Sequence, residues 1–265
     1  MKPEVSIIVP VYNAQEHLQE CISSVLAQGG APWEAVFADD GSTDASSRIL
    51  AGLNDPRIKV VTQANAGPSA ARSAALAAAE GEYVLFLDAD DALVPGAVGI
   101  LLAAAGGADI VVFGAVKVKD GEAYRELHDP VITDPAEYSD AIYRRRAHGC
   151  LWMRMVRRSL LEGVFFPRHG YAEDRIVSLQ LAGKSARTVF IGDVLYRYRR
   201  GLASSLSRKG RRGRKAKEAR NWFDYWRFCG DGKYLETARR LSFMYDWNLL
   251  REINMQRRNT GKHLQ

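Results

Sequence analysis

Residues 5–13 read VSIIVPVYN, an apolar run that ends abruptly on Pro10, Tyr12 and Asn13. Val5–Val9 is therefore predicted to be a buried strand. Helical stretches separate it from four more runs of this kind within the first 116 residues: Ala35–Ala38, Ile58–Val61, Tyr83–Leu87 and Asp109–Val116. Nearly continuous Val, Ile, Leu and Phe strands that alternate with helices are typical of a parallel sheet covered on both faces. The sequence thus predicts an α/β fold with a doubly wound, mostly parallel sheet.

The intervening helices carry start and stop signals of their own. Asn13 followed by Glu16 has the spacing of a capping box, and predicts that the first helix begins there. A second helix is expected after Ser42. The third has Pro68 in its first turn and Gly81 just beyond its end.

The second half of the chain is less regular. From residue 117 to 205 we expect a polar hairpin-like segment, a helix near Ala136–Arg146, apolar pieces around Leu151–Val156 and a helix from Glu173. A strand pair, Thr188–Ile191 and Val194–Tyr198, is expected to close this half. After Ser207 a basic and then aromatic run predicts a helical end. Its first part, residues 208–217, is expected to be a loop.

Polar clusters follow the first, second and fourth predicted strands: PVYN at 10–13, DDGSTD at 39–44 and DADD at 88–91. Ligands of such sheets bind at the carboxyl ends of the strands, so the clusters are expected along one edge. A tyrosine there can stack on a nucleobase, and an acid on the second strand can accept a hydrogen bond from a base N–H. The alternative is that Tyr12 and Asn13 only start a helix and that 39–44 is a capped turn.

Asp88 and Asp90 form the sharpest signal. Two carboxylates at i and i+2 beyond a buried strand can turn toward one hard cation, with diphosphate oxygens and water as its other ligands. Oxygen ligands without a thiolate or imidazole favour Mg²⁺ or Mn²⁺ over zinc. The alternative is a solvated loop with helix-capping aspartates, which is a sufficient explanation of Asp91.

Composition narrows the class of protein. The chain has 265 residues, 47% hydrophobic residues and three scattered cysteines, which is typical of a globular protein of a reducing compartment without a disulfide framework. Neither a signal peptide nor a membrane span is expected. The formal charge is −8 over residues 1–120, +4 over 121–200 and +10 over 201–265.

Three other classes of protein share parts of this pattern. A dinucleotide-dependent oxidoreductase would need Gly-x-Gly-x-x-Gly after the first strand, where this chain has PVYN. A nucleotidyltransferase-like enzyme stays an alternative, although it would need a glycine-rich basic loop there. The other alternative is a non-catalytic binder of anionic polymers through the basic tail. No nucleic acid is expected as a partner, because the acidic strand ends would repel its phosphates.

The motifs VSIIVPVYN, ADDGSTD, NAGPSAAR and FLDADD, in this order and spacing, resemble the N-terminal signature of glycosyltransferase family 2. This bacterial group of GT-A-fold enzymes builds surface polysaccharides. LWMRMVRRSLLEGVFFP, GYAEDRIVSLQLAG and VLYRYRRGLASSLSR resemble the second half of these enzymes, so the resemblance spans residues 4–207.

The resemblance implies a metal-dependent, inverting glycosyltransferase of the hexosyltransferase type, which moves a sugar from a UDP-sugar to a saccharide or lipid-linked acceptor. It places Pro10 and Tyr12 against the nucleobase and Asp40 on its ring N–H. Arg72 would lie near the donor nucleotide, and Arg199, from the basic segment Tyr196–Arg199, over the diphosphate.

For the metal and the catalytic base the resemblance implies four carboxylates. Asp88 and Asp90 would bind Mn²⁺ or Mg²⁺, with Asp88 also counted in the nucleotide site. Asp174 matches the base, and Glu173 remains a rival because sequence does not tell which of the pair faces the site. Met153-Arg154 replaces the Asn-Lys of many relatives, which puts the acceptor in doubt, and Ser73 replaces an Asn.

The expected organisation has three parts. Residues 1–116 form the Rossmann-like nucleotide-sugar half of the GT-A domain, 117–207 its acceptor half, and 208–265 a basic helical extension. Trp222, Phe223 and Trp226 share a helical face that either packs onto the domain or, with the basic residues in 208–228, meets an anionic membrane. We expect a cytoplasmic protein with peripheral contact at the inner face of the plasma membrane.

Overall fold

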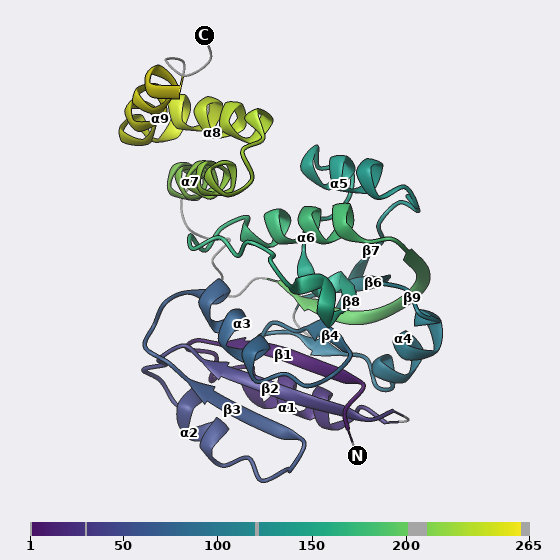
Figure 1. Ribbon diagram of the computed structural model, residues 1–265. Helices are drawn as coiled ribbons and strands as arrows, with labels where there is room; N and C mark the ends of the chain where they lie inside the picture. The colour runs from purple at the N-terminus through teal and green to yellow at the C-terminus, as the bar shows by residue number, and fades with distance from the viewer. Residues whose placement is uncertain (1, 30, 120–121, 201–210, 261–265) are drawn as a thin grey trace.

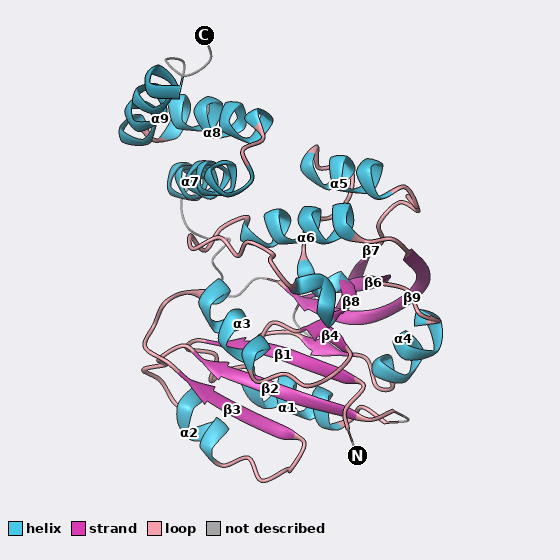
Figure 2. Cartoon of the chain, viewed as in Figure 1, coloured by secondary structure: helices cyan, strands magenta, loops and turns pink. Residues whose placement is uncertain are grey.

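The computed structural model describes residues 2–29, 31–119, 122–200 and 211–260. Its centre is a nine-stranded sheet in the order β3-β2-β1-β4-β8-β6-β9-β5, with β7 paired to the outer part of β6 (Figures 1 and 2). The strands are β1 (Val5–Val11), β2 (Trp33–Asp39), β3 (Ile58–Thr62), β4 (Tyr83–Phe86), β5 (Ala92–Leu93), β6 (Ile110–Lys119), β7 (Glu122–Leu127), β8 (Arg154–Arg157) and β9 (Thr188–Arg199).

Helices cover both faces of the sheet, as the apolar strands predict. One apolar core lies between the sheet and α1 (Leu18–Leu26), α2 (Ser46–Ala51) and α4 (Ala97–Ala105). The other lies between the opposite face and α3 (Pro68–Ala77), α5 (Pro135–Tyr143) and α6 (Glu173–Lys184). Two short 3₁₀ turns, Leu151–Met153 and Arg158–Leu161, flank β8.

The first four strands, β1 to β4, are parallel to one another. Val11 pairs with Asp39 on β2, and Ile8 pairs with Phe86 on β4. The carboxyl ends of β1, β2 and β4 therefore meet at one edge of the sheet, and the three polar clusters follow these ends. The expected edge is confirmed.

The second half departs from the expected pattern in two ways. β8 is inserted between β4 and β6 and runs antiparallel to both. Thr188–Ile191 and Val194–Tyr198 are one strand, β9, and not a strand pair. The sequence prediction left Gly192-Asp193 out of both strands, but β9 continues through these residues parallel to β6, with a register shift near Gly114.

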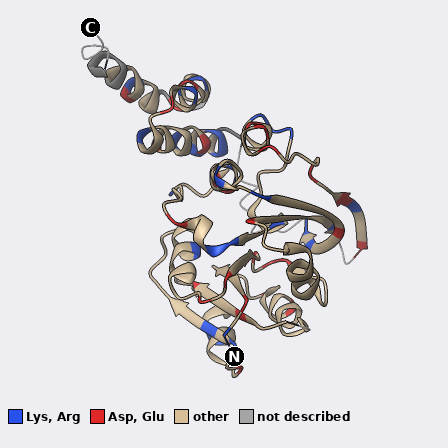
Figure 3. Ribbon diagram, turned by 45° about the vertical axis from the view of Figure 1, so that its right-hand side comes forward, with Lys and Arg blue, Asp and Glu red and all other residues tan. Residues whose placement is uncertain are grey.

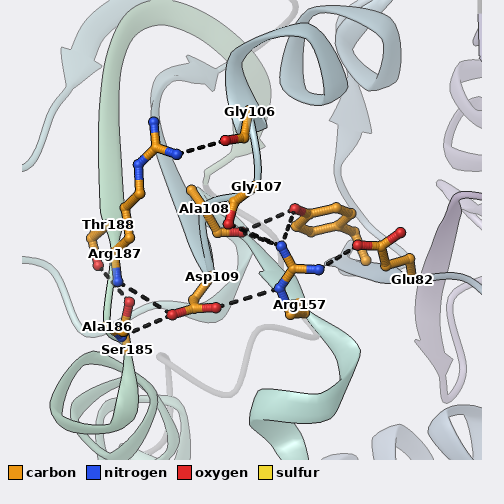
Figure 4. A network of polar contacts seen from close by, with 11 residues as sticks. Glu82, Gly106, Gly107, Ala108, Asp109, Arg157, Ser185, Ala186, Arg187 and Thr188 are labelled. Atoms are coloured by element: carbon orange, nitrogen blue, oxygen red, sulfur yellow. Dashed lines mark hydrogen bonds and ion pairs between the residues drawn. The ribbon is translucent and has the colours of Figure 1, made fainter.

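A polar network joins the two halves at the other edge of the sheet (Figure 4). Arg157 at the end of β8 forms an ion pair with Glu82, contacts Asp109 at 3.4 Å and donates to the hydroxyl of Tyr83 at 2.8 Å. The other oxygen of Asp109 accepts from the backbone N–H of Ala186 just before β9. One arginine therefore ties β8, the start of β4 and the start of β6 together.

The C-terminal extension consists of α7 (Arg211–Cys229), α8 (Gly232–Tyr245) and α9 (Trp247–Thr260), stacked beyond α6 (Figure 1). The loop expected over 208–217 is wrong for 211–217, which belong to α7, and 208–210 lie outside the described residues. The run looks loop-like because it is basic and carries two glycines. Buried Glu218 offsets part of this charge: it binds Lys215 one turn earlier at 2.5 Å, and Arg145 and Arg175 of the main domain at 2.7 and 3.1 Å.

Aromatic residues of α7 pack inward. Trp222 and Phe223 are buried against the core that contains α5 and α6, and Trp222 stacks on Tyr234 of α8. The packing interpretation of this face is therefore confirmed for these two residues. Lys and Arg occur along α7–α9 (Figure 3), and membrane contact stays a prediction. In the described ranges no helix is both long enough and apolar enough to span a bilayer.

Candidate active site

The loops after β1 and β2 are bound to each other. Asn13 lies in the left-handed region at φ 50°, and its side-chain oxygen accepts from the backbone N–H of Thr43 at 2.8 Å. α1 begins only at Leu18. The capping-box prediction is therefore wrong, because Asn13 caps the neighbouring loop and not its own helix.

Pro10 lies near the end of β1 and Tyr12 directly follows the strand, where Tyr12 is 51% exposed. Asp40 is buried, and its carboxylate accepts from Gln63 Nε2 at 2.7 Å and from the backbone N–H groups of Ala66 and Gly67 at 2.9 and 2.8 Å. Asp40 therefore holds the loop that leads into α3. The sequence offered a contact with the base or a capped turn over 39–44 for this carboxylate, and neither includes the loop before α3.

Arg72 of α3 is the centre of the site. Its buried guanidinium bonds Asp88 Oδ1 at 3.0 Å and Asp174 Oδ1 at 2.8 Å, and lies 3.6 Å from Glu173 Oε1. The loop after β4 and the start of α6, about ninety residues apart, thus meet on one side chain. Three carboxylates around one guanidinium leave an excess of negative charge.

The environment of Asp90 fits a cation. Burial and the neighbouring Asp88 carboxylate raise the pKa of Asp90 to about 6, and within the described residues no other side chain donates to its carboxylate. A hard cation would remove this repulsion, and both aspartates offer oxygen ligands. The described residues hold no group of three or more metal-ligating side chains, so the remaining ligands of an ion bound here would come from substrate and water.

Asp91 is a structural anchor that sequence reasoning underrated. It is buried, and it accepts from the Tyr196 hydroxyl at 2.8 Å and from the Arg199 backbone N–H at 2.7 Å. The Tyr196 hydroxyl in turn accepts from the backbone N–H of Asp88 at 3.1 Å. β9 therefore fixes the loop that carries Asp88 and Asp90. No local pattern reveals a partner more than one hundred residues away.

Arg199 reaches the same loop from β9. Its Nε donates to the carbonyl of Asp90 at 3.1 Å, and its outer nitrogen forms an ion pair with Glu20 of α1. The side chain thus lies beside the Asp90 backbone, and its single charge is already partnered by Glu20. A position over the diphosphate stays a prediction.

Glu173 and Asp174 begin α6, directly after Ala172, a non-glycine residue at φ 61°. Both carboxylates face Arg72, but only Asp174 also lines the neighbouring cavity. Burial raises the pKa of both groups, and the charge of Arg72 opposes this shift. The geometry favours Asp174 as the residue that meets a substrate.

The cavity beside Asp174 has a volume of about 400 Å³. Trp152 lies in its wall and stacks on Tyr196 and Tyr198, at centroid distances of 4.7 and 5.0 Å. Arg154, at the departure from the family pattern, is buried behind the cavity and bonds Asp129 at 2.7 Å. Sequence reasoning missed most residues of this wall: Lys117, Leu127, His148, Gly149, Cys150, Tyr171, Ala172, Arg175 and Arg200.

Comparison with known proteins places this geometry in a family. The model described as "Glycosyl transferase family 2" matches residues 6–165. The putative glycosyltransferase EpsH of Bacillus subtilis is 30% identical over 222 residues, which cover 78% of this chain and 63% of EpsH. The succinoglycan biosynthesis protein ExoO of Rhizobium meliloti is 33% identical over 171 residues, which cover 60% of this chain and 49% of ExoO. The chain thus spans less than two thirds of the length of these relatives.

Solved structures share the fold. S. aureus TarS 1-349 in complex with UDP-GlcNAc has a TM-score of 0.70 at 23% identity, over 92% of this chain and 73% of that one. The mannosyltransferase PcManGT of Pyrobaculum calidifontis, in complex with GDP-Man and Mn²⁺, has a TM-score of 0.57 at 20% identity, over 86% and 65%. The fold is therefore the GT-A fold. Because the family model matches more than half of its residues, the chain belongs to glycosyl transferase family 2.

Proposed function

We propose that the chain is an inverting, metal-dependent glycosyltransferase that moves a sugar from a nucleoside-diphosphate donor, with UDP-sugar as the first choice, to a saccharide or lipid-linked acceptor in polysaccharide biosynthesis. Family membership, the printed role of ExoO and the nucleotide sugars bound by TarS and PcManGT support this. The observation that carries the proposal is the Arg72 guanidinium, which joins Asp88 of the candidate metal pair to Asp174, the candidate base.

Asp174 would act as the general base. It lines the cavity where an acceptor can enter, so its carboxylate can take the proton of the acceptor hydroxyl while the hydroxyl oxygen bonds to the anomeric carbon. The bond from that carbon to the diphosphate breaks on the opposite face, and its electron pair goes to the departing oxygen. Arg72 stabilises the ionised form of Asp174, against the effect of burial. General-base assistance of this kind is worth roughly 10²–10⁴ in rate.

Asp88 and Asp90 would hold Mn²⁺ or Mg²⁺, and the burial and repulsion at Asp90 support this choice. A bound divalent ion supplies charge stabilisation to a departing diphosphate. On the nucleotide side, the exposed ring of Tyr12 next to Pro10 is available for stacking on a base. Asp40 would then act mainly by holding the loop before α3, and Arg199 by flanking the diphosphate beside the Asp90 carbonyl.

The three-part division at residues 116 and 207, the cytoplasmic location and the contact of 208–228 with an anionic membrane remain predictions.

One contact of the C-terminal extension bears on the candidate active site. Buried Asn221 of α7 donates to the carbonyls of His169 and Tyr171 and accepts from the backbone N–H of His169, just before α6. The extension would therefore support the catalytic loop whether or not it meets a membrane.

A thermal-shift screen of nucleotide sugars with and without Mn²⁺ tests the proposal, because a ligand that binds only the folded state raises its stability by mass action. We expect a shift that requires both the nucleotide sugar and the ion. The Asp90→Asn variant is the matched control and should lose the ion-dependent part. The absence of any shift with all common nucleotide sugars would contradict the proposed function.

A further inference from the structure

The cavity beside Asp174 is separate from the residues assigned to the donor. Pro10, Tyr12, Asp40, Asp88 and Asp90 do not line it, whereas Asp174 does. Its volume of about 400 Å³ is in the range of small-ligand sites. If the proposed function is correct, this cavity receives the acceptor, and the residues of its wall decide which acceptor is bound.

Two basic residues of the wall have no acidic partner within the described ranges. Lys117 lies on β6, opposite Tyr198 of β9. Arg200 is the first residue after β9, and its backbone N–H donates to the Val118 carbonyl. The side chain of Arg200 lies 5.9 Å from the centre of the Tyr198 ring. Among the described residues, neither Lys117 nor Arg200 forms an ion pair with Asp or Glu, and the Arg200 side chain is hydrogen-bonded to Tyr198 and Tyr124 instead.

The other two basic residues of the cavity wall, Arg175 and His148, differ from Lys117 and Arg200 in having acidic partners. Arg175 is bound to Glu218 at 3.1 Å, and His148 is bound to Asp129 at 2.8 Å. These side chains therefore carry their own counter-charge. Lys117 differs: burial, and then the charges of Arg125 and Arg200, lower its pKa. A lowered lysine pKa means that the site repels further positive charge and would gain from an anion.

A neutral sugar gains little from two such cations, because its hydroxyls offer only ordinary hydrogen bonds. A carboxylate or phosphate gains charge-assisted hydrogen bonds, which are about twice as strong. Such a group is also planar or compact enough to meet a lysine and an arginine together. The aromatic wall formed by Trp152 and Tyr198 offers an apolar surface beside them.

From this arrangement we infer that the acceptor is anionic: a saccharide whose carboxylate or phosphate is bound by Lys117 and Arg200 while one of its hydroxyls faces Asp174. The inference rests on the proposed function and adds the substrate class. The inference also explains how the Asp174 carboxylate can share a cavity with an anionic acceptor. The positive charges of Lys117 and Arg200 would offset the repulsion between the two negative groups.

The test uses the full chain loaded with UDP and Mn²⁺, and three probes that share a ring: glucose, glucuronate and glucose 6-phosphate. Binding is followed by ligand-observed NMR titration. We expect one or both acidic probes to bind about tenfold more tightly than glucose, the usual gain from one charge-assisted bond. The two acidic probes distinguish a carboxylate from a phosphate as the recognised group.

Two variants and one control assign the effect. Lys117→Met and Arg200→Gln should each remove most of the preference for the acidic probe, and leave the affinity for UDP with Mn²⁺ within twofold. Arg48→Gln removes an exposed charge on α2, outside the cavity, and should change neither quantity. Equal binding of glucose and both acidic probes would overturn the inference, as would a loss of UDP affinity in the two variants, which would assign the cations to the donor.

Failure of the proposed function has a different signature. In that case the unaltered protein binds neither UDP nor any nucleotide sugar in the presence of Mn²⁺, and the acceptor assignment falls with it. If the protein binds UDP and shows no preference among the probes, only the acceptor inference is rejected.

Discussion

Replacing Arg72 by Met should destabilise the protein in a strongly pH-dependent way. Arg72 is the buried cation between Asp88 and Asp174, at 3.0 and 2.8 Å, with Glu173 at 3.6 Å. Loss of one partner of a buried ion pair costs about 3–5 kcal/mol, because the remaining charges stay buried. We expect this loss in the free energy of unfolding at pH 8. At pH 5 we expect a smaller loss, because burial and the neighbouring Asp174 raise the pKa of Glu173 to about 7, so that its protonation removes part of the buried negative charge.

The sign follows from the direction of the pKa shifts. Burial already raises the pKa of Glu173 and Asp174 above their ordinary values, so the folded protein binds these protons more tightly than the unfolded chain. Stability therefore falls as the pH rises from the ordinary carboxyl range through the folded pKa values. Without the guanidinium the pKa values of Glu173 and Asp174 rise further. Stability is then lost over a wider pH range, and the total loss in the free energy of unfolding at high pH is larger.

Urea unfolding of the metal-free protein in EDTA, at pH 5 and pH 8, measures this difference. The Arg72→Lys variant keeps the charge but not the two-pronged geometry, and should recover part of the stability at pH 8. An equal loss at both pH values in Arg72→Met would refute the electrostatic reasoning and assign the effect to packing alone.

Four further outcomes are expected. The Asp90→Asn variant should lose ion-dependent hydrolysis of the donor while its unfolding transition is kept; retained hydrolysis would reject the metal role. Asp174→Asn should keep donor binding but lower the transfer rate by roughly 10²–10⁴. Glu173→Gln should lower this rate far less. If steady-state assays show the larger loss in Glu173→Gln, Glu173 is the base. Tyr196→Phe removes the hydroxyl that lies between Asp88 and Asp91, and should lower the free energy of urea unfolding by about 2–3 kcal/mol. An unchanged free energy would mean that this hydroxyl does not hold the loop that carries Asp88 and Asp90. Asn221→Ala leaves backbone groups of the loop before α6 unpaired, and should lower the free energy of unfolding by about 2–4 kcal/mol. If amide hydrogen exchange in residues 169–172 does not become faster in this variant, α7 does not support that loop.

The sheet edge could be predicted because it depends on local patterns. Apolar runs at 5–9 and 83–87 form buried strands wherever helices can cover them, and parallel strands bring PVYN, DDGSTD and DADD to one edge. The start of the first helix could not be predicted in the same way. Asn13 has the spacing of a cap, but its side chain finds a better partner in the loop after β2, thirty residues away.

The order of the second half needed long-range pairing. The sequence of β8 indicates only an apolar segment, and nothing in it predicts the place of this strand in the sheet. Its hydrogen bonds to β4 and β6 place it between these two strands. The sequence prediction left the glycine and aspartate at 192–193 out of both strands, but β9 continues through them, with a register shift near Gly114. Burial of the α7 aromatics follows from contacts with α5, α6 and α8 that no helical periodicity specifies.

By itself, then, the sequence indicated which residues are candidates for the proposed reaction: the carboxylates at 88, 90, 173 and 174, and the tyrosine at 12. Residue type and position after a strand are local properties, and they survive without a fold. Tertiary structure alone decided how these groups act on one another. Arg72 became the shared counter-ion of two distant segments, Asp174 became the carboxylate that lines the cavity, and Lys117 and Arg200 came to line that same cavity. Charge and burial depend on every neighbour in space, and those neighbours come from segments up to a hundred residues apart.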